Sequence, residues 1–394
     1  MNKNLNGGVL TVFLSGHIDS SNANETEKEI MQDVARCEYD SLVLDLKDLE
    51  YISSAGLRIL LKLRKQNPTM TAVNASADVY EIFEVTGFTE LFPISKAMRE
   101  ISIDGCEVVG EGANGIVYRI ARDTIVKVYK NPDSLDEIRR ERELSRTAFV
   151  LGIPTAIAYD VVRVGESYGA VFELLDAKSF AEMMQENPGN LEFVAQKSVE
   201  VAKIIHSTLA LAGLPSEFDV VLKWIGMIRD YLTEEEYEKF LCLVNALPHN
   251  GTLIHGDYHI KNVMQMGEET LLIDMDTLSI GHPIFELAFM YNAYKGFGLI
   301  DPSVVERFMG ISADTAYRLW HRMLALYIGS EDEERLNTVE EKAELIGLLR
   351  LMRRRITKGT HLTPEGLAFV EACRIRIKAI LQRVDTLDFE CYEA

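Results

Sequence analysis

Residues 255–262, which read His-Gly-Asp-Tyr-His-Ile-Lys-Asn, and residues 271–274, which read Leu-Leu-Ile-Asp, decide the fold of this chain. The segment between them contains two short apolar runs around a Gly-Glu-Glu turn, which predicts a β-hairpin. Symmetric pairing around Glu268 would place Asn262 opposite Asp274, with Cβ atoms about 4.5–5.5 Å apart. Amide and carboxylate oxygens are ligands that suit Mg²⁺. The pattern therefore predicts a Mg²⁺ site at the open end of the hairpin.

Asp257 precedes Asn262 by five residues, the interval between the base and the metal-binding amide in the catalytic loop of kinases. It would lie one short loop away from the predicted metal site, where its carboxylate can accept a hydroxyl proton. We therefore predict a phosphoryl-transfer site with Asp257 as the base and with Asn262 and Asp274 as Mg²⁺ ligands.

Residues 109–117 form a G-x-G-x-x-G-x-V pattern, which dinucleotide-binding loops and kinase glycine loops share. A dinucleotide-binding loop opens a helix, whereas this segment continues as a strand and turns back into a second strand at 124–129. The context favours a hairpin that covers the phosphates of ATP. Gly110, Gly112 and Gly115 would let backbone N–H groups approach the phosphate oxygens. A glycine-rich turn without a ligand is the alternative.

Lys127 lies within that second strand, where burial of an unpaired ammonium group is costly. The phosphates of ATP and a helix carboxylate would supply the anions that it needs. The charged amphipathic helix predicted over 135–150 offers three carboxylates, Glu137, Glu141 and Glu143.

Two further strands, 156–164 and 168–175, complete the predicted sheet. Backbone groups near Glu173 and Leu175, at the hinge where the sheet ends, are the expected contacts to adenine. After Ser179 helical periodicity dominates.

The ordered set of glycine loop, strand lysine, helix glutamate, His-Gly-Asp-x-x-x-x-Asn and Ile-Asp resembles the aminoglycoside phosphotransferase/choline kinase-like family. The resemblance runs from about Cys106 to at least Tyr294. In this family His-Gly-Asp replaces the His-Arg-Asp of protein kinases. The resemblance favours Glu141 as the partner of Lys127, with Glu143 as the alternative.

The same resemblance bears on residues around the predicted site. It implies that His255 braces the loop, and we expect His259 and His206 to be structural. Asp276 is interpreted either as a contact to a second metal ion or as a cap of the next turn. Glu286 replaces an Asp of the family in a helix that supports the loop.

The first hundred residues predict a small α/β domain. The predicted elements are strands at 9–14, 41–46 and 70–73, a turn at 16–19, and helices at 22–34, from 53–54 onward and at 80–86. Residues 44–57, together with Ser-Gly-His-Ile-Asp at 15–19 and Thr-Gly-Phe at 86–88, resemble STAS domains, the fold of bacterial anti-sigma factor antagonists.

Ser54 stands where phosphorylatable STAS domains carry the modified Ser or Thr at the start of a helix. Ser53 precedes it, where those antagonists often carry Asp. A Ser at either position can instead cap the helix, an interaction worth about 1 kcal/mol. The two interpretations are compatible, so Ser54 is our candidate for regulatory phosphorylation.

Composition limits the classes of function. The 394 residues carry a net charge of −20, which argues against sequence-independent nucleic-acid binding. The five cysteines are scattered without a CxxC spacing, and no uncharged apolar run approaches membrane-spanning length. These features predict a cytoplasmic protein. The run Arg353-Arg354-Arg355 forms either a solvated helix end or a contact to an anionic substrate or a partner.

The sequence therefore predicts an α/β STAS domain at 1–102 and a two-lobed α+β kinase-like phosphotransferase domain at 103–394, β-rich to about 176 and helical beyond. We expect an enzyme that uses ATP and Mg²⁺ to phosphorylate a hydroxyl of a small molecule of the sugar, amino alcohol or aminocyclitol class. The STAS module would bind a protein partner. The alternative is a regulatory protein kinase or nucleotide-sensing switch that acts through the STAS surface in an anti-sigma-type pathway.

Overall fold

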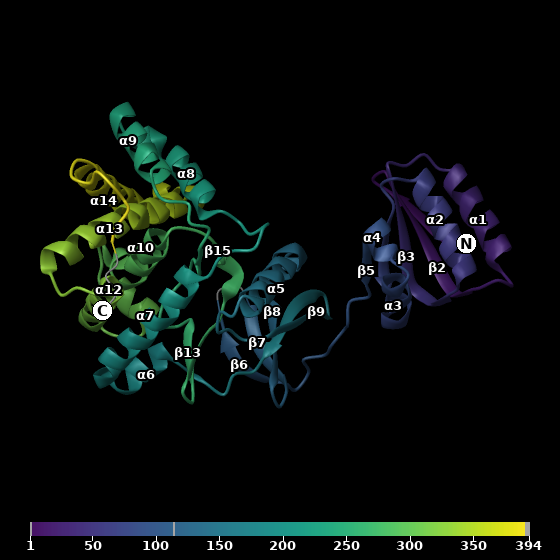
Figure 1. The fold of residues 1–394 in the computed structure, drawn as a ribbon, viewed down its shortest axis with the longest axis horizontal. Helices are drawn as coiled ribbons and strands as arrows, with labels where there is room; N and C mark the ends of the chain where they lie inside the picture. Colours follow the sequence, from purple (N-terminus) through teal and green to yellow (C-terminus); the bar gives the residue numbers. More distant parts are fainter. Residues whose placement is uncertain (1, 113–114, 391–394) are drawn as a thin grey trace. The chain divides into compact units, whose positions relative to one another are not determined.

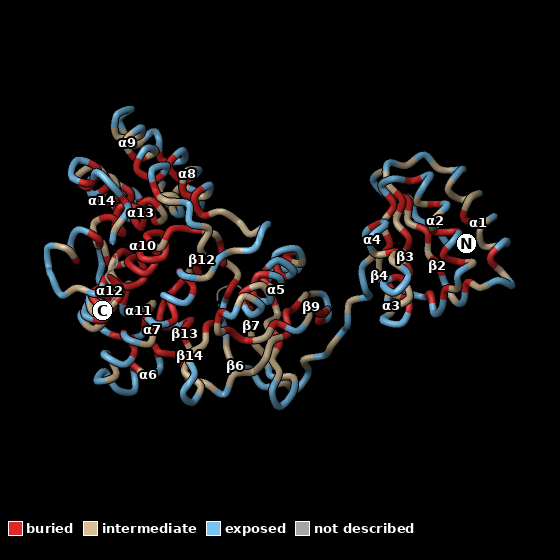
Figure 2. The backbone as a smooth tube through the Cα atoms, viewed as in Figure 1, coloured by how far each residue is buried: buried red, intermediate tan, exposed pale blue. Residues whose placement is uncertain are grey.

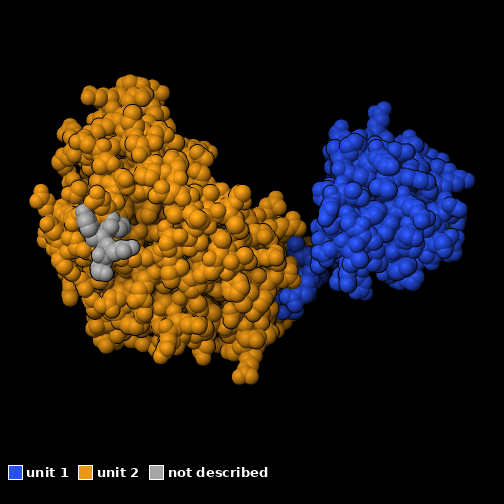
Figure 3. All heavy atoms as spheres, viewed as in Figure 1, with its two compact units in different colours: residues 1–102 blue, residues 103–394 orange. Residues whose placement is uncertain are grey.

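The computed structural model of this protein describes residues 2–112 and 115–390 of the 394-residue chain. The chain divides into two compact units, Met1–Ser102 and Ile103–Ala394 (Figure 3). Each unit has its own buried core. Within the described ranges, no helix combines the length and the apolar character needed to cross a lipid bilayer.

The first unit is a five-stranded sheet with four helices. Its strands lie in the order β1-β2-β3-β4-β5, and β1 and β2 are antiparallel whereas the other neighbours are parallel (Figure 1). The elements are β1 (Lys3–Asn6), β2 (Val9–Ile18), α1 (Ala23–Ala35), β3 (Ser41–Ile52), α2 (Ser54–Gln66), β4 (Thr71–Ala75), α3 (Ala77–Val85), α4 (Phe88–Leu91) and β5 (Ile94–Lys96).

Alternation of apolar residues sets which face of β2 is buried. Leu10, Val12 and Leu14 are each at most 1 % exposed, as expected for one face of a strand whose side chains alternate. The strand was predicted to end at residue 14 and a turn was predicted at 16–19; this prediction was wrong, because β2 continues to Ile18. Gly16 has φ +65° and lies beside a shift in the pairing with β3, so the strand bends there without ending.

The second unit begins with an antiparallel sheet in the order β6-β7-β8-β10-β9, which packs against α5. The elements are β6 (Glu107–Glu111), β7 (Gly115–Ala121), β8 (Thr124–Tyr129), α5 (Leu135–Val150), β9 (Ala158–Val164) and β10 (Ser167–Glu173). Helix α5 buries Ile138, Glu141, Ser145 and Ala148, which recur at helical spacing. The buried face of α5 therefore includes one carboxylate, that of Glu141.

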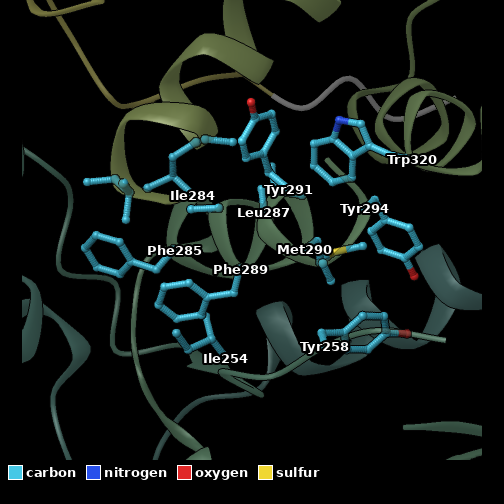
Figure 4. Close-up of a cluster of buried hydrophobic side chains, with 14 of the residues drawn as sticks. Ile254, Tyr258, Ile284, Phe285, Leu287, Phe289, Met290, Tyr291, Tyr294 and Trp320 are labelled. Atoms are coloured by element: carbon cyan, nitrogen blue, oxygen red, sulfur yellow. The ribbon is translucent and has the colours of Figure 1, made fainter. Parts of the chain in front are cut away.

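Helices form most of the remainder. They are α6 (Phe180–Glu186), α7 (Leu191–Ser207), α8 (Glu217–Met227), α9 (Glu234–Asn245), α10 (Pro283–Tyr294), α11 (Ser303–Met309), α12 (Ala313–Ile328), α13 (Glu333–Thr357) and α14 (Pro364–Leu381). All residues of α10 from Ile284 to Tyr294 are buried, which marks it as the central helix (Figure 2). Figure 4 shows its apolar side chains beside Tyr258 and Trp320. The predicted succession of a β-rich and a helical lobe is confirmed.

Short strands between these helices carry the segments of the candidate site. Strand β12 (Leu253–Ile254) pairs with β15 (Ser279–Ile280). A second small sheet consists of β11 (Lys178–Ser179), β13 (Val263–Met266) and β14 (Glu269–Leu272). The His-Gly-Asp loop, residues 255–262, therefore runs from β12 to β13, and Asp274 follows β14.

Candidate active site

Helix α10 fixes the start of the His-Gly-Asp loop. The fully buried Glu286 side chain accepts hydrogen bonds from the backbone N–H groups of His255 and Gly256, the latter at 3.1 Å. Gly256 has φ +84°, and a Cβ atom there would lie 2.6 Å from the carbonyl oxygen of Thr277. This position therefore requires glycine.

His255 joins the loop to the end of β14. Its Nδ1 accepts a hydrogen bond from the Asp257 N–H at 3.2 Å, and its Nε2 donates to the Ile273 carbonyl at 3.1 Å. This pair of contacts is that of a neutral imidazole, and it supports a bracing role for His255. Farther along the loop, the Ile260 N–H donates to the Tyr294 hydroxyl at 3.1 Å, so α10 holds the loop at two points.

The hairpin that follows the loop is shifted by one residue from the predicted register. Strands β13 and β14 are joined by a two-residue turn, Gly267 and Glu268, with Gly267 at φ +58°, whereas the prediction centred the turn on Glu268. Asn262 therefore lies opposite Ile273, whose N–H donates to the Asn262 carbonyl at 3.0 Å, and not opposite Asp274. The predicted direct pairing of the two metal ligands was wrong.

Asp274 reaches the site because its backbone leaves the strand. Its φ of +63° is left-handed, and its Oδ1 lies 2.7 Å from Lys127 Nζ. The Asn262 side chain donates from Nδ2 to the Asp257 carbonyl at 3.0 Å, which leaves its amide oxygen for a ligand. Neither Asn262 Oδ1 nor Asp274 Oδ2 accepts a hydrogen bond from the residues that the structure describes.

These two oxygens fit Mg²⁺ by their chemistry, since the ion prefers oxygen ligands. The described part of the chain contains no cluster of three or more His, Cys, Asp or Glu side chains that could hold a metal ion. A small protein set of this kind suits Mg²⁺, which often keeps several waters and binds substrate phosphates in addition to one or two protein carboxylates.

Lys127 connects two carboxylates from different parts of the unit. Its Nζ lies 2.9 Å from Glu141 Oε1 on α5 and 2.7 Å from Asp274 Oδ1. Among the three glutamates considered on that helix, Glu141 is the one in contact, and its second oxygen accepts a hydrogen bond from the Tyr129 hydroxyl. Burial lowers the pKa of Lys127, but the charges of Asp274 and Glu141 outweigh burial and hold the pKa above its usual value.

Asp257 presents a partly exposed carboxylate, with 49 % of its side chain accessible. His259 Nε2 lies 3.6 Å from its Oδ2, and an Arg350 nitrogen lies 4.0 Å from its Oδ1. Partial burial raises the pKa of Asp257, but His259 and Arg350 outweigh this effect and the pKa is about 2. The group is therefore ionised at neutral pH.

The glycine hairpin is described except for residues 113 and 114, which lie between the predicted phosphate-binding glycines Gly112 and Gly115. Gly110 belongs to β6, and the Gly112 N–H donates to the Gly115 carbonyl at 2.9 Å. A Cβ atom at Gly115 would lie 2.6 Å from a carbonyl oxygen of β8. Gly115 is thus required for the packing of β7 against β8. The sequence-based prediction explained this glycine only by the approach of backbone N–H groups to phosphate.

The predicted hinge lies at the end of β10. The Glu173 N–H donates to the Ile157 carbonyl at 3.0 Å, and the Leu174 N–H donates to the Asp123 carbonyl at 2.9 Å. Within residues 173–175, only the Leu175 N–H makes no hydrogen bond to the described parts of the chain. Leu175 is therefore the residue of this segment whose amide could still donate to a ligand, and adenine binding there stays a prediction.

Asp276 lies beside Asp274 in a short turn, Met275–Thr277. Its side chain makes no hydrogen bond to any described residue, so the predicted cap of the next turn is not formed. Burial, together with the carboxylates of Asp274 and Glu141, raises the pKa of Asp276 to about 7. Contact with a second metal ion stays a prediction.

A cavity of about 630 Å³ adjoins the His-Gly-Asp loop. Its wall includes Gly256 and Asp276, side chains of α5, α8, α10 and α13, and residues of β8, β15 and the adjoining loops. This volume lies within the usual range for small-molecule pockets. The sequence-based prediction missed Trp224, Phe289 and Arg350, because the helices that carry them are distant in sequence. The arginine run that begins at residue 353 was the one available signal.

In the first unit, α2 begins at Ser54. Ser53 is the capping residue, and its hydroxyl accepts a hydrogen bond from the Ala55 N–H at 3.2 Å. Ser54 is exposed. Capping is thus performed by Ser53, and regulatory phosphorylation of the exposed Ser54 stays a prediction.

Comparison with known families gives two matches. Residues 1–101 match the STAS domain, and residues 105–326 match the phosphotransferase enzyme family. Over 94 residues, the chain is 37 % identical to BtrV of Bordetella bronchiseptica, which carries the name of an anti-sigma factor antagonist; the match covers 23 % of this chain and 80 % of BtrV. The anti-sigma F factor antagonist of Paenibacillus polymyxa is 25 % identical over 91 residues, 22 % of this chain and 78 % of that protein.

Solved structures are similar over a larger share of the chain. A choline/ethanolamine kinase family protein from Mesorhizobium loti is 14 % identical with a TM-score of 0.44, covering 71 % of this chain and 88 % of that one. A gentamicin complex of APH(2″)-IIa is 16 % identical with a TM-score of 0.45, covering 79 % of this chain and 97 % of that one.

Proposed function

Because this chain belongs to the phosphotransferase enzyme family and carries a STAS domain before the matched region, we propose that it is an ATP- and Mg²⁺-dependent small-molecule kinase. In the proposed reaction, the acceptor hydroxyl oxygen attacks the γ-phosphorus of ATP. The bond between the γ-phosphorus and the β–γ bridging oxygen breaks, and ADP leaves. The hydroxyl proton passes to Asp257, and the product is a phosphate monoester.

One observation carries this proposal: Lys127 joins Glu141 on α5 to Asp274 after β14, at 2.9 and 2.7 Å, beside the His-Gly-Asp loop. An ammonium group held in this way can neutralise charge on the phosphates of ATP. Glu141, itself bonded to the Tyr129 hydroxyl, would keep Lys127 in the required orientation.

Asn262 and Asp274 would hold Mg²⁺ through the two oxygens that accept no hydrogen bond from described residues. When bound, the ion would neutralise phosphate charge and help to orient the γ-phosphoryl group. The Leu175 N–H, together with backbone groups near Glu173, would bind adenine. Gly110, Gly112 and Gly115 shape the hairpin that would cover the phosphates.

Asp257 would orient the acceptor hydroxyl and take its proton. A carboxylate with a pKa of about 2 is a weak base, but it is fully ionised and can accept the hydroxyl hydrogen bond. This suffices for phosphoryl transfer through a loose transition state, because positioning and charge neutralisation supply most of the acceleration.

The test uses the full-length protein, labelled Mg²⁺-ATP and a panel of small hydroxyl compounds. Asp257→Asn should lower transfer by about 10²–10⁴-fold and retain Mg²⁺-ATP binding, because the base is not a metal ligand. Asp274→Ala should abolish Mg²⁺-dependent turnover and leave the fold intact. Asp314→Asn, at an exposed position on α12, is the matched control. Full activity of Asp257→Asn, or Mg²⁺-dependent turnover by Asp274→Ala, would contradict the roles.

The STAS match favours a second role alongside catalysis. We propose that the first unit binds a protein partner and that phosphorylation of Ser54 regulates this binding. Ser54 is exposed at the start of α2, where free N–H groups and the helix dipole can accommodate a phosphate. If a protein is the acceptor instead of a small molecule, the chain would be a regulatory kinase. Label that appears on protein and on no compound of the panel would favour that alternative.

A further inference from the structure

Two arginines line the cavity next to the His-Gly-Asp loop, one helical turn apart on α13. Arg350 lies over the ring of Phe289, with 3.9 Å between its guanidinium carbon and the ring centroid. Arg353 lies over the ring of Trp224 at 4.3 Å. Aromatic faces therefore hold both guanidinium groups, and Arg350 also lies 4.0 Å from the Asp257 carboxylate.

The hydrogen-bonding capacity of this pair is largely unused. Arg350 donates to the backbone carbonyl of Gly256 at 2.9 Å. Arg353 makes neither a hydrogen bond nor an ion pair with any described residue, and its buried Nε has no partner. Burial and the neighbouring charge of Arg350 lower the pKa of Arg353, in spite of the opposing influence of Glu217. Two like charges in a partly buried wall are costly unless an anion joins them.

The other two arginines of the same run do not share the position of Arg353 in the cavity wall. Arg354 is exposed, and Arg355 lies over the Phe369 ring at 4.4 Å. Only Arg353 of the three lines the described cavity. A helix end that was merely solvated would not direct one arginine onto an aromatic ring beside the loop that carries Asp257.

We infer that the acceptor is a small hydroxyl compound that carries a carboxylate or phosphate group, and that Arg350 and Arg353 bind this group. This inference rests on the proposed phosphotransferase function. Arginine forks match the geometry of both anions. Since Arg350 also lies 4.0 Å from Asp257, an anion on the pair would hold a nearby hydroxyl close to the base. A polycationic aminocyclitol would instead meet two positive charges beside the base.

The rest of the lining contains the carboxylates of Glu137, Glu141 and Asp276 and two further cations, Lys130 and Arg140. Lys130 pairs with Glu111 at 3.0 Å and Arg140 is exposed, so neither is held on an aromatic ring in the wall as the two arginines of α13 are. Glu217 also lines the cavity, but its side chain is buried and accepts a hydrogen bond from the Ser279 hydroxyl at 3.3 Å. The stacked arginines of α13 are therefore the best-held cations of the lining for an anionic group.

The cavity contains one of the two tryptophans of the chain, so binding can be followed by fluorescence. Full-length protein with Trp320→Phe would report on Trp224 alone. The probes are inorganic phosphate and glycerate as anions, glycerol as the neutral counterpart of glycerate, and kanamycin as a polycation. We expect saturable changes with phosphate and glycerate, and at least tenfold weaker binding of glycerol and kanamycin.

Arg353→Gln should weaken binding of both anions at least tenfold, whereas Arg354→Gln, the same change at the adjacent exposed residue, should leave it unaltered. Thermal unfolding of both variants verifies that they fold. Equal anion binding by Arg353→Gln and Arg354→Gln, or tighter binding of kanamycin than of glycerate, would overturn the inference. So would a loss of Mg²⁺-ATP affinity in Arg353→Gln equal to its loss of anion affinity, because the arginine would then bind the nucleotide.

Two further comparisons complete the experiment. The first distinguishes a carboxylate acceptor from a phosphorylated one, and the second distinguishes anion binding from kinase activity. Tighter binding of glycerate than of phosphate indicates a carboxylate acceptor, and the reverse order indicates a phosphorylated one; either order supports the inference. Lys127→Ala should not change anion affinity, whereas it should impair transfer from ATP. Anion binding that depends on Arg353, without transfer to any anionic hydroxyl compound, would refute the proposed kinase activity and leave the binding site established.

Discussion

The buried carboxylate of Glu286 should control both the stability of the second unit and the position of the base. It is fully buried and accepts hydrogen bonds from the backbone N–H groups of His255 and Gly256. Glu286→Gln keeps the shape but replaces one acceptor oxygen by an amino group. One charge-assisted hydrogen bond is lost, worth about 1.5–3 kcal/mol, and a buried N–H is left facing a donor, which costs about 1–3 kcal/mol more. We expect a loss of about 3 kcal/mol in the free energy of unfolding.

Urea unfolding followed by tryptophan emission measures this loss. Both tryptophans, Trp224 and Trp320, belong to the second unit, so the signal is independent of the STAS domain. At a slope of about 3 kcal/mol/M, the midpoint should fall by about 1 M. Turnover should fall as well, because the Gly256 N–H that Glu286 holds lies directly before the proposed base, Asp257, and loss of this hydrogen bond would displace that carboxylate. Glu238→Gln, at an exposed position of α9, should change stability by less than about 0.5 kcal/mol. A change this small in Glu286→Gln would refute the role of the carboxylate.

Three further predictions concern other parts of the chain. Lys127→Ala should lower kcat by about 10²-fold and change Mg²⁺-ATP affinity less, and Glu141→Ala should show a milder form of the same defect in steady-state kinetics. If nucleotide affinity fell as much as kcat, Lys127 would serve binding and not transfer. Mass spectrometry after incubation with labelled ATP and cell extract should find label at Ser54, whereas Ser54→Ala should keep full turnover; absence of label would leave Ser54 as a surface residue. A maleimide should modify the exposed Cys242 at pH 7 before unfolding and Cys373 only after it, because burial raises the pKa of Cys373 to about 12. Early modification of Cys373 would contradict the packing of α14.

Sequence was sufficient where the chemistry is local. Asp257 and Asn262 are five residues apart, so their spacing alone predicts a shared loop. The glycine hairpin and Lys127 are likewise recognisable from a strand, turn and strand. The support of the loop by Glu286 was also foreseeable, because the helix pattern around it is specific.

Other features depend on geometry that a pattern does not contain. The register of the β13–β14 hairpin depends on whether Gly267 and Glu268 alone form the turn. The alternation of apolar residues in the sequence does not decide this. The cavity wall combines α8 and α13, which lie more than a hundred residues apart. Neither Trp224 nor Arg350 has a local signal that distinguishes it from an ordinary helix residue, and their proximity follows from packing alone.

Helix α10 has a consequence for how such a protein can diversify. Glu286 and Tyr294, eight residues apart on this one buried helix, hold the His-Gly-Asp loop at its start and at Ile260, a separation of about 12 Å along the helix axis. Trp224 and Arg353, on α8 and α13, take no part in those hydrogen bonds. Under the proposed function, exchanges at these two wall positions would change the acceptor preference in a lineage and retain the inherited arrangement of the loop.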